Sequence, residues 1–203
     1  IYGKPMLASL MREVAKIDGI KWIRTLYAYP ERITDELIDV IAEEPKCVKY
    51  LDIPIQHCDG EVLRRMNRRG DEKTLRELIA KLRERIPGII LRTTLIAGFP
   101  TETEEEFDEV AEFAKEIGFE RLGCFAYSTE EDTPAALMEQ VEEEERRAKQ
   151  QEQDRKAAEK EQELLKKAYG ASVKAIKEIL LKDKQKIKNA KLNEEKKKDL
   201  ILV

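Results

Sequence analysis

Apolar positions in residues 1–138 alternate between the spacing typical of helices and that typical of strands. The first set has helical spacing and is followed by Gly19, a common helix terminator; it comprises Leu7, Leu10, Met11, Val14 and Ile17. Residues 22–29 form a short apolar and aromatic run that predicts a strand ending at Pro30. A second helix is predicted from the N-cap Thr34 to Pro45.

The alternation continues through three more strands and two more helices. Residues 50–55, 89–97 and 122–127 are predicted strands, although Pro54 inside the first would demote it in an ordinary sheet. One helix is predicted over 71–86, with Asp71 as its N-cap. The other begins with a capping box at 103–106 and ends at Gly118. Strands separated by single helices indicate βα units, and therefore an α/β fold with a parallel sheet.

Ligands of parallel sheets gather at the carboxyl ends of the strands. The predicted strand ends are Tyr29-Pro30, Gln56-His57, Gly98-Phe99-Pro100 and Tyr127-Ser128. His57, the only histidine, is either a hydrogen-bonded residue at a barrel rim or part of a ligand pocket, and both interpretations stay open. Tyr127 could contact an aromatic ligand.

Residues 92–102 form the most specific segment. Strand alternation places Arg92 and Thr94 on one face, and Gly98 would let the backbone approach a ligand closely. A charge inside a small barrel needs a partner, and we favour a ligand anion such as a carboxylate for Arg92. Asp52 is interpreted instead as a structural partner for a nearby arginine.

Charge divides the chain unevenly. Residues 1–138 carry 20 Lys/Arg against 27 Asp/Glu, whereas the remaining residues carry 18 against 15. Residues 142–163 are mostly charged, which favours a solvated helix with no buried face. A weakly amphipathic helix is predicted from Leu164 to Leu180. The Lys-rich end could contact nucleic acid, but no aromatic residue follows Tyr169, which favours a solvated surface.

Three cysteines, Cys47, Cys58 and Cys124, have no disulfide or metal-type spacing, and a reducing cytoplasm fits them best. We expect Cys58 and Cys124 to be small buried residues. No apolar run is long enough to predict a membrane span. The opening Ile1-Tyr2-Gly3-Lys4 has no initiator Met or signal-peptide pattern, and we expect it to come from the middle of a longer protein.

Four segments together carry a family resemblance: Arg24 to Pro30, Lys49 to His57, Leu91 to Glu106 and Arg121 to Ser128. They resemble the later strands of the radical SAM domain in methylthiotransferases. The resemblance implies the last four βα units of a partial parallel (β/α) barrel over residues 1–141. It also implies that a charged, mostly helical tail over 142–203 replaces a small β-barrel (TRAM) domain.

The segment from Asp52 to His57 is similar to the RimO-type branch, which modifies ribosomal proteins. That branch adds a methylthio group to the β-carbon of an aspartate in a small-subunit ribosomal protein, using S-adenosylmethionine and two 4Fe–4S clusters. The residues implied to line the S-adenosylmethionine side of the barrel are Gln56, His57, Arg92, Thr94, Gly98 and Tyr127.

The chain departs from the family in several places. The cysteines that ligate the clusters are not in this sequence, so we expect the chain alone to be inactive and the N-terminal half of the barrel to be a candidate partner. Thr101 and Asp132 stand where the family usually has glycine. The alternatives are a tRNA-modifying relative of the same family, or a non-catalytic scaffold or assembly module.

Overall fold

The computed structural model describes residues 3–160, 162–163 and 166–167. The chain divides into two units, Ile1–Lys160 and Glu161–Val203, and the sheet and its helices belong to the first. The helix expected from Leu164 to Leu180 and the Lys-rich end lie almost entirely outside the described residues.

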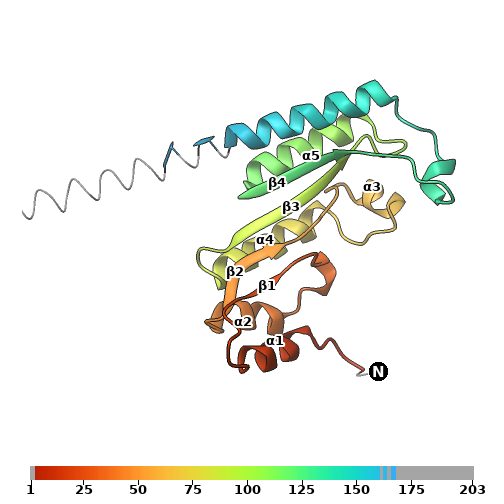
Figure 1. The fold of residues 1–203 in the computed structure, drawn as a ribbon. Coiled ribbons are helices and arrows are strands. Elements are labelled where there is room, and N and C mark those ends of the chain that lie inside the picture. The colour runs from red at the N-terminus through yellow and green to blue at the C-terminus, as the bar shows by residue number, and fades with distance from the viewer. Residues whose placement is uncertain (1–2, 161, 164–165, 168–203) are drawn as a thin grey trace, which may run out of the picture. The chain divides into compact units, whose positions relative to one another are not determined.

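Four parallel strands form one sheet in the order β1-β2-β3-β4 (Figure 1). The strands are β1 (Ile23–Thr25), β2 (Cys47–Asp52), β3 (Ile90–Ala97) and β4 (Arg121–Ala126). The connecting helices are α1 (Leu7–Ala15), α2 (Asp35–Glu43), α3 (Gly60–Arg65), α4 (Glu72–Arg85) and α5 (Glu104–Ile117). Short 3-10 turns lie at Pro30–Arg32 and Pro134–Leu137. The predicted α/β class and parallel sheet are confirmed.

Side-chain caps explain where the predicted helices begin. Thr34 accepts a hydrogen bond from the backbone N–H of Leu37 at the start of α2. Asp71 and Thr103 each form a complete capping box at the start of α4 and α5. Helix α3 was not predicted from the apolar pattern; it is a short helix with Asp59 as its N-cap.

β1 and β2 end at least three residues earlier than predicted, for different reasons, and β2 also begins three residues earlier, at Cys47. β1 ends at Thr25 because Tyr27 adopts a left-handed conformation, φ 57°, that a strand does not accommodate. β2 ends at Asp52, just before Pro54, which has no N–H to donate to a neighbouring strand. Pairing resumes for one residue where Gln56 bridges to Leu95.

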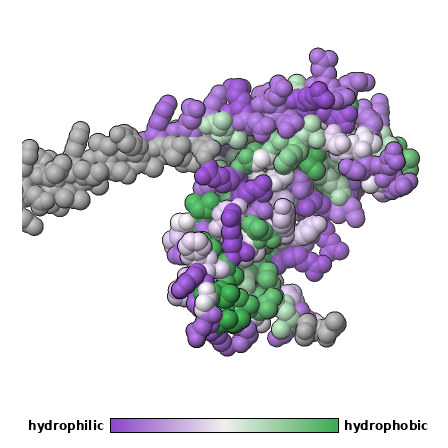
Figure 2. All heavy atoms as spheres, in the orientation of Figure 1, coloured by the Kyte–Doolittle hydropathy of each residue, from purple (hydrophilic) through white to green (hydrophobic). Residues whose placement is uncertain are grey.

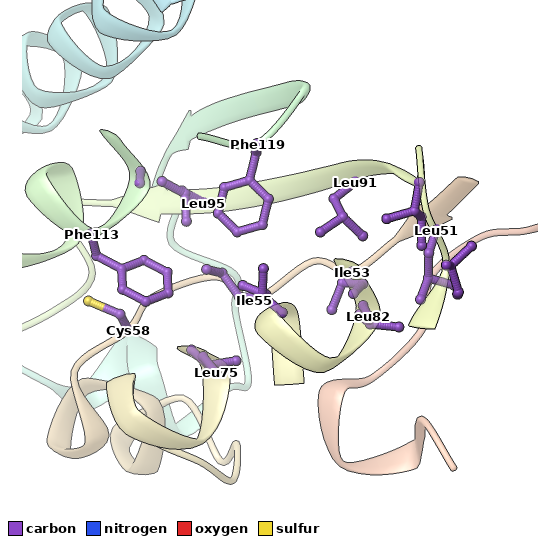
Figure 3. Packing of buried hydrophobic residues seen from close by; sticks show 14 of the residues in the cluster. Leu51, Ile53, Ile55, Cys58, Leu75, Leu82, Leu91, Leu95, Phe113 and Phe119 are labelled. Carbon is purple, nitrogen blue, oxygen red and sulfur yellow. The ribbon is translucent and has the colours of Figure 1, made fainter. Parts of the chain in front are cut away.

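The core lies between one face of the sheet and helices α2, α4 and α5. Along β3, Leu91, Thr93, Leu95 and Ala97 are buried while the residues between them are half-buried, as the two-residue period of a strand requires. Figure 3 shows Leu95, Phe113 and Ile55 pointing toward one another within this core. The Thr93 hydroxyl is also satisfied, because it donates to the Ile53 carbonyl at 2.9 Å.

The opposite face of the sheet carries mixed polar and apolar side chains. Arg92, Thr94 and Ile96 lie on it, and Phe125 beside Ile96 on β4 is 55% exposed. Figure 2 shows hydrophilic side chains over the helix that follows the sheet, and apolar ones gathered over the region of α1, α2 and β1. The sheet therefore has one buried face and one open face.

Residues 143–160 are helical, but the expectation that this helix buries no face is wrong. Lys149 and Gln153 are buried, at 4% and 2% exposure, and Arg146 and Gln150 lie on the same side at helical spacing. Gln150 Nε2 donates to the Cys124 carbonyl at 3.1 Å, and an Arg146 guanidinium N–H donates to the Tyr127 carbonyl at 2.9 Å. This polar stripe covers the outer edge of β4.

Helix 143–160 also runs beside α5. The Lys149 ammonium lies 5.2 Å from the Phe107 ring centroid, near the start of α5. Lys160 lies beside Gly118, which caps the end of α5. The two helices therefore point in the same direction, and the charged segment is an integral part of the first unit.

Candidate functional site

Backbone hydrogen bonds bring three of the predicted strand ends together. The Gln56 N–H donates to the Thr94 carbonyl, and the Gln56 carbonyl accepts from Ile96, both at 2.9 Å. The Tyr127 N–H donates to the Ala97 carbonyl at 2.9 Å. Gln56, the end of β3 at Gly98, and Tyr127 are thus neighbours at the carboxyl edge of the sheet, where ligands of parallel sheets bind.

Each of the first three strands is followed by a residue in the left-handed conformation. Tyr27, Gln56 and Gly98 have φ values of 57°, 70° and 70°. This conformation costs a non-glycine residue about 1–2 kcal/mol, and such strain concentrates at binding sites. Gly98 adopts this conformation without strain, whereas Tyr27 and Gln56 are strained, and Gln56 is one of the predicted strand-end residues.

Thr101 and Asp132, at which the resemblance implies glycine, also have positive φ, at 66° and 62°. The Glu102 N–H donates to the Phe99 carbonyl at 2.9 Å, which closes a turn with Pro100 second and Thr101 third. A turn with proline at its second position and a positive φ at its third is a type II turn, and glycine is unstrained at that third position. Glycine would therefore be unstrained at position 101, and Thr101 adopts this conformation at a cost.

Arg92 is paired with Asp52, as the interpretation of Asp52 predicted. A terminal guanidinium nitrogen of Arg92 lies 2.9 Å from Asp52 Oδ1 and 3.4 Å from the Thr94 hydroxyl. The Asp52 side chain is 3% exposed and that of Arg92 is 34% exposed. The hydrogen bond to Asp52 raises the pKa of Arg92. Asp52 therefore supplies the partner that was expected from a ligand anion, while the partly exposed guanidinium keeps some of its surface on the open face.

His57 is fully enclosed, with no exposed surface. Its Nδ1 accepts a hydrogen bond from the Asp59 N–H at 3.0 Å, so the proton of the neutral ring is on Nε2. Burial lowers its pKa from 6.5 to about 4. The side chain is therefore a neutral imidazole, and its Nε2 faces Glu102 Oε1 at 3.7 Å.

Glu102 was not among the predicted site residues, yet it is a buried carboxylate in direct contact with Gly98. Its Oε2 accepts from the Gly98 N–H at 2.8 Å and lies 3.4 Å from Lys149 Nζ. Burial raises the pKa of Glu102. An acidic residue four positions after a strand-end glycine was the sequence signal that could have identified it.

Two more polar atoms at the strand ends have unused hydrogen-bonding capacity. Gln56 Oε1 and the Tyr127 hydroxyl are buried and have no partner among the described residues. The Tyr127 ring packs edge-on against Phe99 with centroids 5.3 Å apart. Unpaired buried polar atoms need an explanation, and a ligand with donor and acceptor groups would satisfy both.

The three cysteines are buried thiols on separate elements. Cys47 and Cys124 lie in β2 and β4, and Cys58 lies in the loop after β2. Burial raises the pKa of Cys58, and that of Cys124 to about 12. Within residues 3–160 and the few described beyond them, no group of three potential metal ligands comes together. The described residues therefore do not fit an iron–sulfur cluster, which requires converging thiolates.

No helix in the described part of the chain is long and apolar enough to cross a bilayer.

Comparison with known families and structures agrees with this arrangement. Residues 2–114 match the family model described as the radical SAM superfamily. Coproporphyrinogen III oxidase (HemN) from Escherichia coli aligns with a TM-score of 0.59 and 24% identity, covering 76% of this chain and 36% of that one. The likeness supports the fold, a partial barrel of the radical SAM type.

Curated relatives are more similar in sequence. The ribosomal protein uS12 methylthiotransferase RimO of Desulfitobacterium hafniense (strain Y51) is 59% identical over 138 residues, which are 68% of this chain and 31% of that protein. The Geobacter sulfurreducens protein of the same name is 60% identical over 136 residues, 67% of this chain and 30% of that protein. The chain thus spans about a third of the length of these relatives.

Proposed function

The chain belongs to the radical SAM superfamily, and we propose that it forms the carboxyl-terminal, S-adenosylmethionine-binding part of a methylthiotransferase barrel. Its substrate would be a ribosomal protein of the small subunit, modified on the β-carbon of an aspartate. The support is the identity of 59% and 60% to two uS12 methylthiotransferases, together with the strand-end geometry. A ribosomal substrate would place the reaction in the cytoplasm.

The observation that carries the proposal is the meeting of Gln56, Gly98 and Tyr127 at one edge, above Arg92 and Thr94 on the open face. Gln56 Oε1 and the Tyr127 hydroxyl would hydrogen-bond the ligand, and the Arg92 guanidinium would bind its carboxylate. Gly98 would border the ligand through its backbone alone, because Arg146 of helix 143–160 fills the space that a side chain at Gly98 would take. His57, which is fully buried, would support these strand ends from inside the protein without touching the ligand.

S-adenosylmethionine, when bound, supplies the radical chemistry that gives the superfamily its name. The residues of this chain would bind and orient it. The two 4Fe–4S clusters of the parent family do not fit the described cysteines, so their ligands would come from another part of the enzyme, such as the N-terminal half of the barrel. Nucleic-acid contact through the basic tail concerns residues that the structure does not describe.

Equilibrium dialysis with S-adenosylmethionine tests the binding role. We expect saturable binding by the purified chain that Arg92→Gln weakens about tenfold or more, as loss of a charge-assisted hydrogen bond predicts. Arg155→Gln is the matched control, because Arg155 is exposed on helix 143–160 and pairs with Glu159. Equal affinity in the two variants would refute the role of Arg92, and absence of binding would refute the proposal.

Of the two alternatives, only the non-catalytic scaffold predicts a different outcome of the dialysis. A tRNA-modifying relative would place the same cofactor on the same strand ends, and the Asp52-to-His57 segment favours the ribosomal branch over it. A non-catalytic scaffold would self-associate without binding S-adenosylmethionine, which sedimentation velocity would show alongside dialysis.

Anaerobic reconstitution with iron and sulfide should leave the chain without the visible absorption of a cluster.

A further inference from the structure

Three ionisable side chains from three separate elements are buried together behind the end of β3. His57 follows β2, Glu102 lies in the turn before α5, and Lys149 lies on helix 143–160. Their exposures are 0%, 5% and 4%. Burying three such groups is costly unless they satisfy one another.

Glu102 is the centre of this group. One carboxylate oxygen, Oε2, accepts from the Gly98 N–H at 2.8 Å and lies 3.4 Å from Lys149 Nζ. The other, Oε1, faces the protonated Nε2 of His57 at 3.7 Å, and neither of these two atoms has a hydrogen-bond partner among the described residues. The 3.7 Å separation is longer than a hydrogen bond, so the contact between them is electrostatic.

His57, Glu102 and Lys149 together form a buried polar network, and its two outer members, His57 and Lys149, each have a further contact of their own. The Asp59 N–H donates to His57 Nδ1, which fixes the ring with Nε2 toward Glu102. Lys149 is also held by Glu145 at 3.0 Å and by Glu104 at 3.4 Å, both of which are exposed. The carboxylate therefore has a neutral donor on one side and a cation on the other.

We propose that His57 and Lys149 are positioning residues that hold the Glu102 carboxylate against the Gly98 amide, and so fix the turn at the end of β3. The proposal rests on the proposed function for its consequence, because a fixed Gly98 is what the ligand would contact. It assigns helix 143–160 a part in the site, since Lys149 belongs to that helix.

The single histidine makes the first test direct. Long-range ¹H–¹⁵N spectra of the full chain should show one neutral imidazole at pH 7, with the proton on Nε2. A proton on Nδ1 would overturn the proposal, because Nδ1 could not then accept from Asp59 and Nε2 could not donate toward Glu102.

The second test measures hydrogen exchange of the Gly98 amide. Glu102→Gln and Lys149→Met should each accelerate it about tenfold or more, since a hydrogen bond to a charged group is lost or weakened. Glu104→Gln is the matched control, because Glu104 also contacts Lys149 but does not touch Gly98, and it should change exchange less than about threefold. Equal rates in Glu102→Gln and Glu104→Gln would overturn the network.

His57 variants separate positioning from simple packing. His57→Gln keeps an amide donor that can reach Glu102, whereas His57→Leu keeps apolar volume only. Positioning predicts slower Gly98 exchange in the Gln variant than in the Leu variant, and a packing role predicts the reverse order. If neither variant folds, the imidazole proton and the Glu102→Gln rate still decide the question.

The failure of this proposal is distinguishable from that of the proposed function. If the chain binds no S-adenosylmethionine while Gly98 exchange responds as expected, the network stands and the proposed function fails. If it binds the ligand while Gly98 exchange in Glu102→Gln matches that of the unaltered chain, the network fails alone.

Discussion

Substituting Gly98 by alanine tests how closely helix 143–160 packs on the strand end. Gly98 has φ 70°, and a Cβ added there would lie 2.9 Å from Cβ and 3.1 Å from Cα of Arg146, and closer still to its Cγ. The left-handed backbone alone costs alanine about 1–2 kcal/mol, and overpacking adds about 1–3 kcal/mol. We therefore expect Gly98→Ala to lower the free energy of unfolding by about 3 kcal/mol.

Gly88→Ala is the matched control, because Gly88 has φ 78° and a Cβ there would meet nothing within 4 Å. It should cost only about 1 kcal/mol, from the backbone alone. Urea denaturation followed by far-ultraviolet circular dichroism gives both values. Adding Arg146→Ala to Gly98→Ala should recover about 1 kcal/mol, since part of the obstructing side chain is removed. Equal costs at the two glycines would refute the packing of Arg146 on Gly98.

Three further predictions concern charge and strain. The pKa of His57 is about 4 in the folded chain against 6.5 normally, so the unfolded chain takes up a proton first as pH falls. The contribution of His57 to the free energy of unfolding is complete above pH 6.5 and should fall by about 2 kcal/mol by pH 5. This part of the pH dependence should vanish in His57→Gln. Arg92→Leu should cost about 2 kcal/mol in urea denaturation, because Asp52 is left unpaired, and the Arg92→Leu/Asp52→Leu double variant should cost less than the single one. Thr101→Gly should raise the free energy of unfolding by about 1 kcal/mol, because φ 66° is unstrained for glycine, and no gain would contradict the assigned turn.

The apolar periods predicted the elements whose stability depends on a buried apolar face. Helix α4 was located by its N-cap Asp71 and its apolar stripe, helix α5 by its capping box and apolar stripe, and β3 by its alternation. Asp52 was also interpreted correctly, because a carboxylate between apolar strand residues requires a cation. These features are local or follow directly from burial.

Features that depend on polar contacts between distant segments were missed. Helix 143–160 buries Lys149 and Gln153 instead of leucine or valine, so its packed face has no apolar signature. Glu102 contacts Gly98, four residues before it, and Lys149, which is distant in the sequence, and the second contact could not be read from the local pattern. The short helix α3 lacks the repeated apolar stripe on which helix prediction depends. Assignment of residues 142–203 as a tail replacing another domain stays a prediction.

The most direct test of the central claim is a titration of the full chain with S-adenosylhomocysteine, followed by ¹H–¹⁵N correlation spectra. S-adenosylhomocysteine retains the adenosine and carboxylate groups that the strand ends would bind. We predict saturable shift changes concentrated at the amides of Gln56, Gly98 and Tyr127, and much weaker ones in Arg92→Gln. Unchanged spectra, or changes confined to other parts of the chain, would contradict the assignment of these strand ends as the cofactor site.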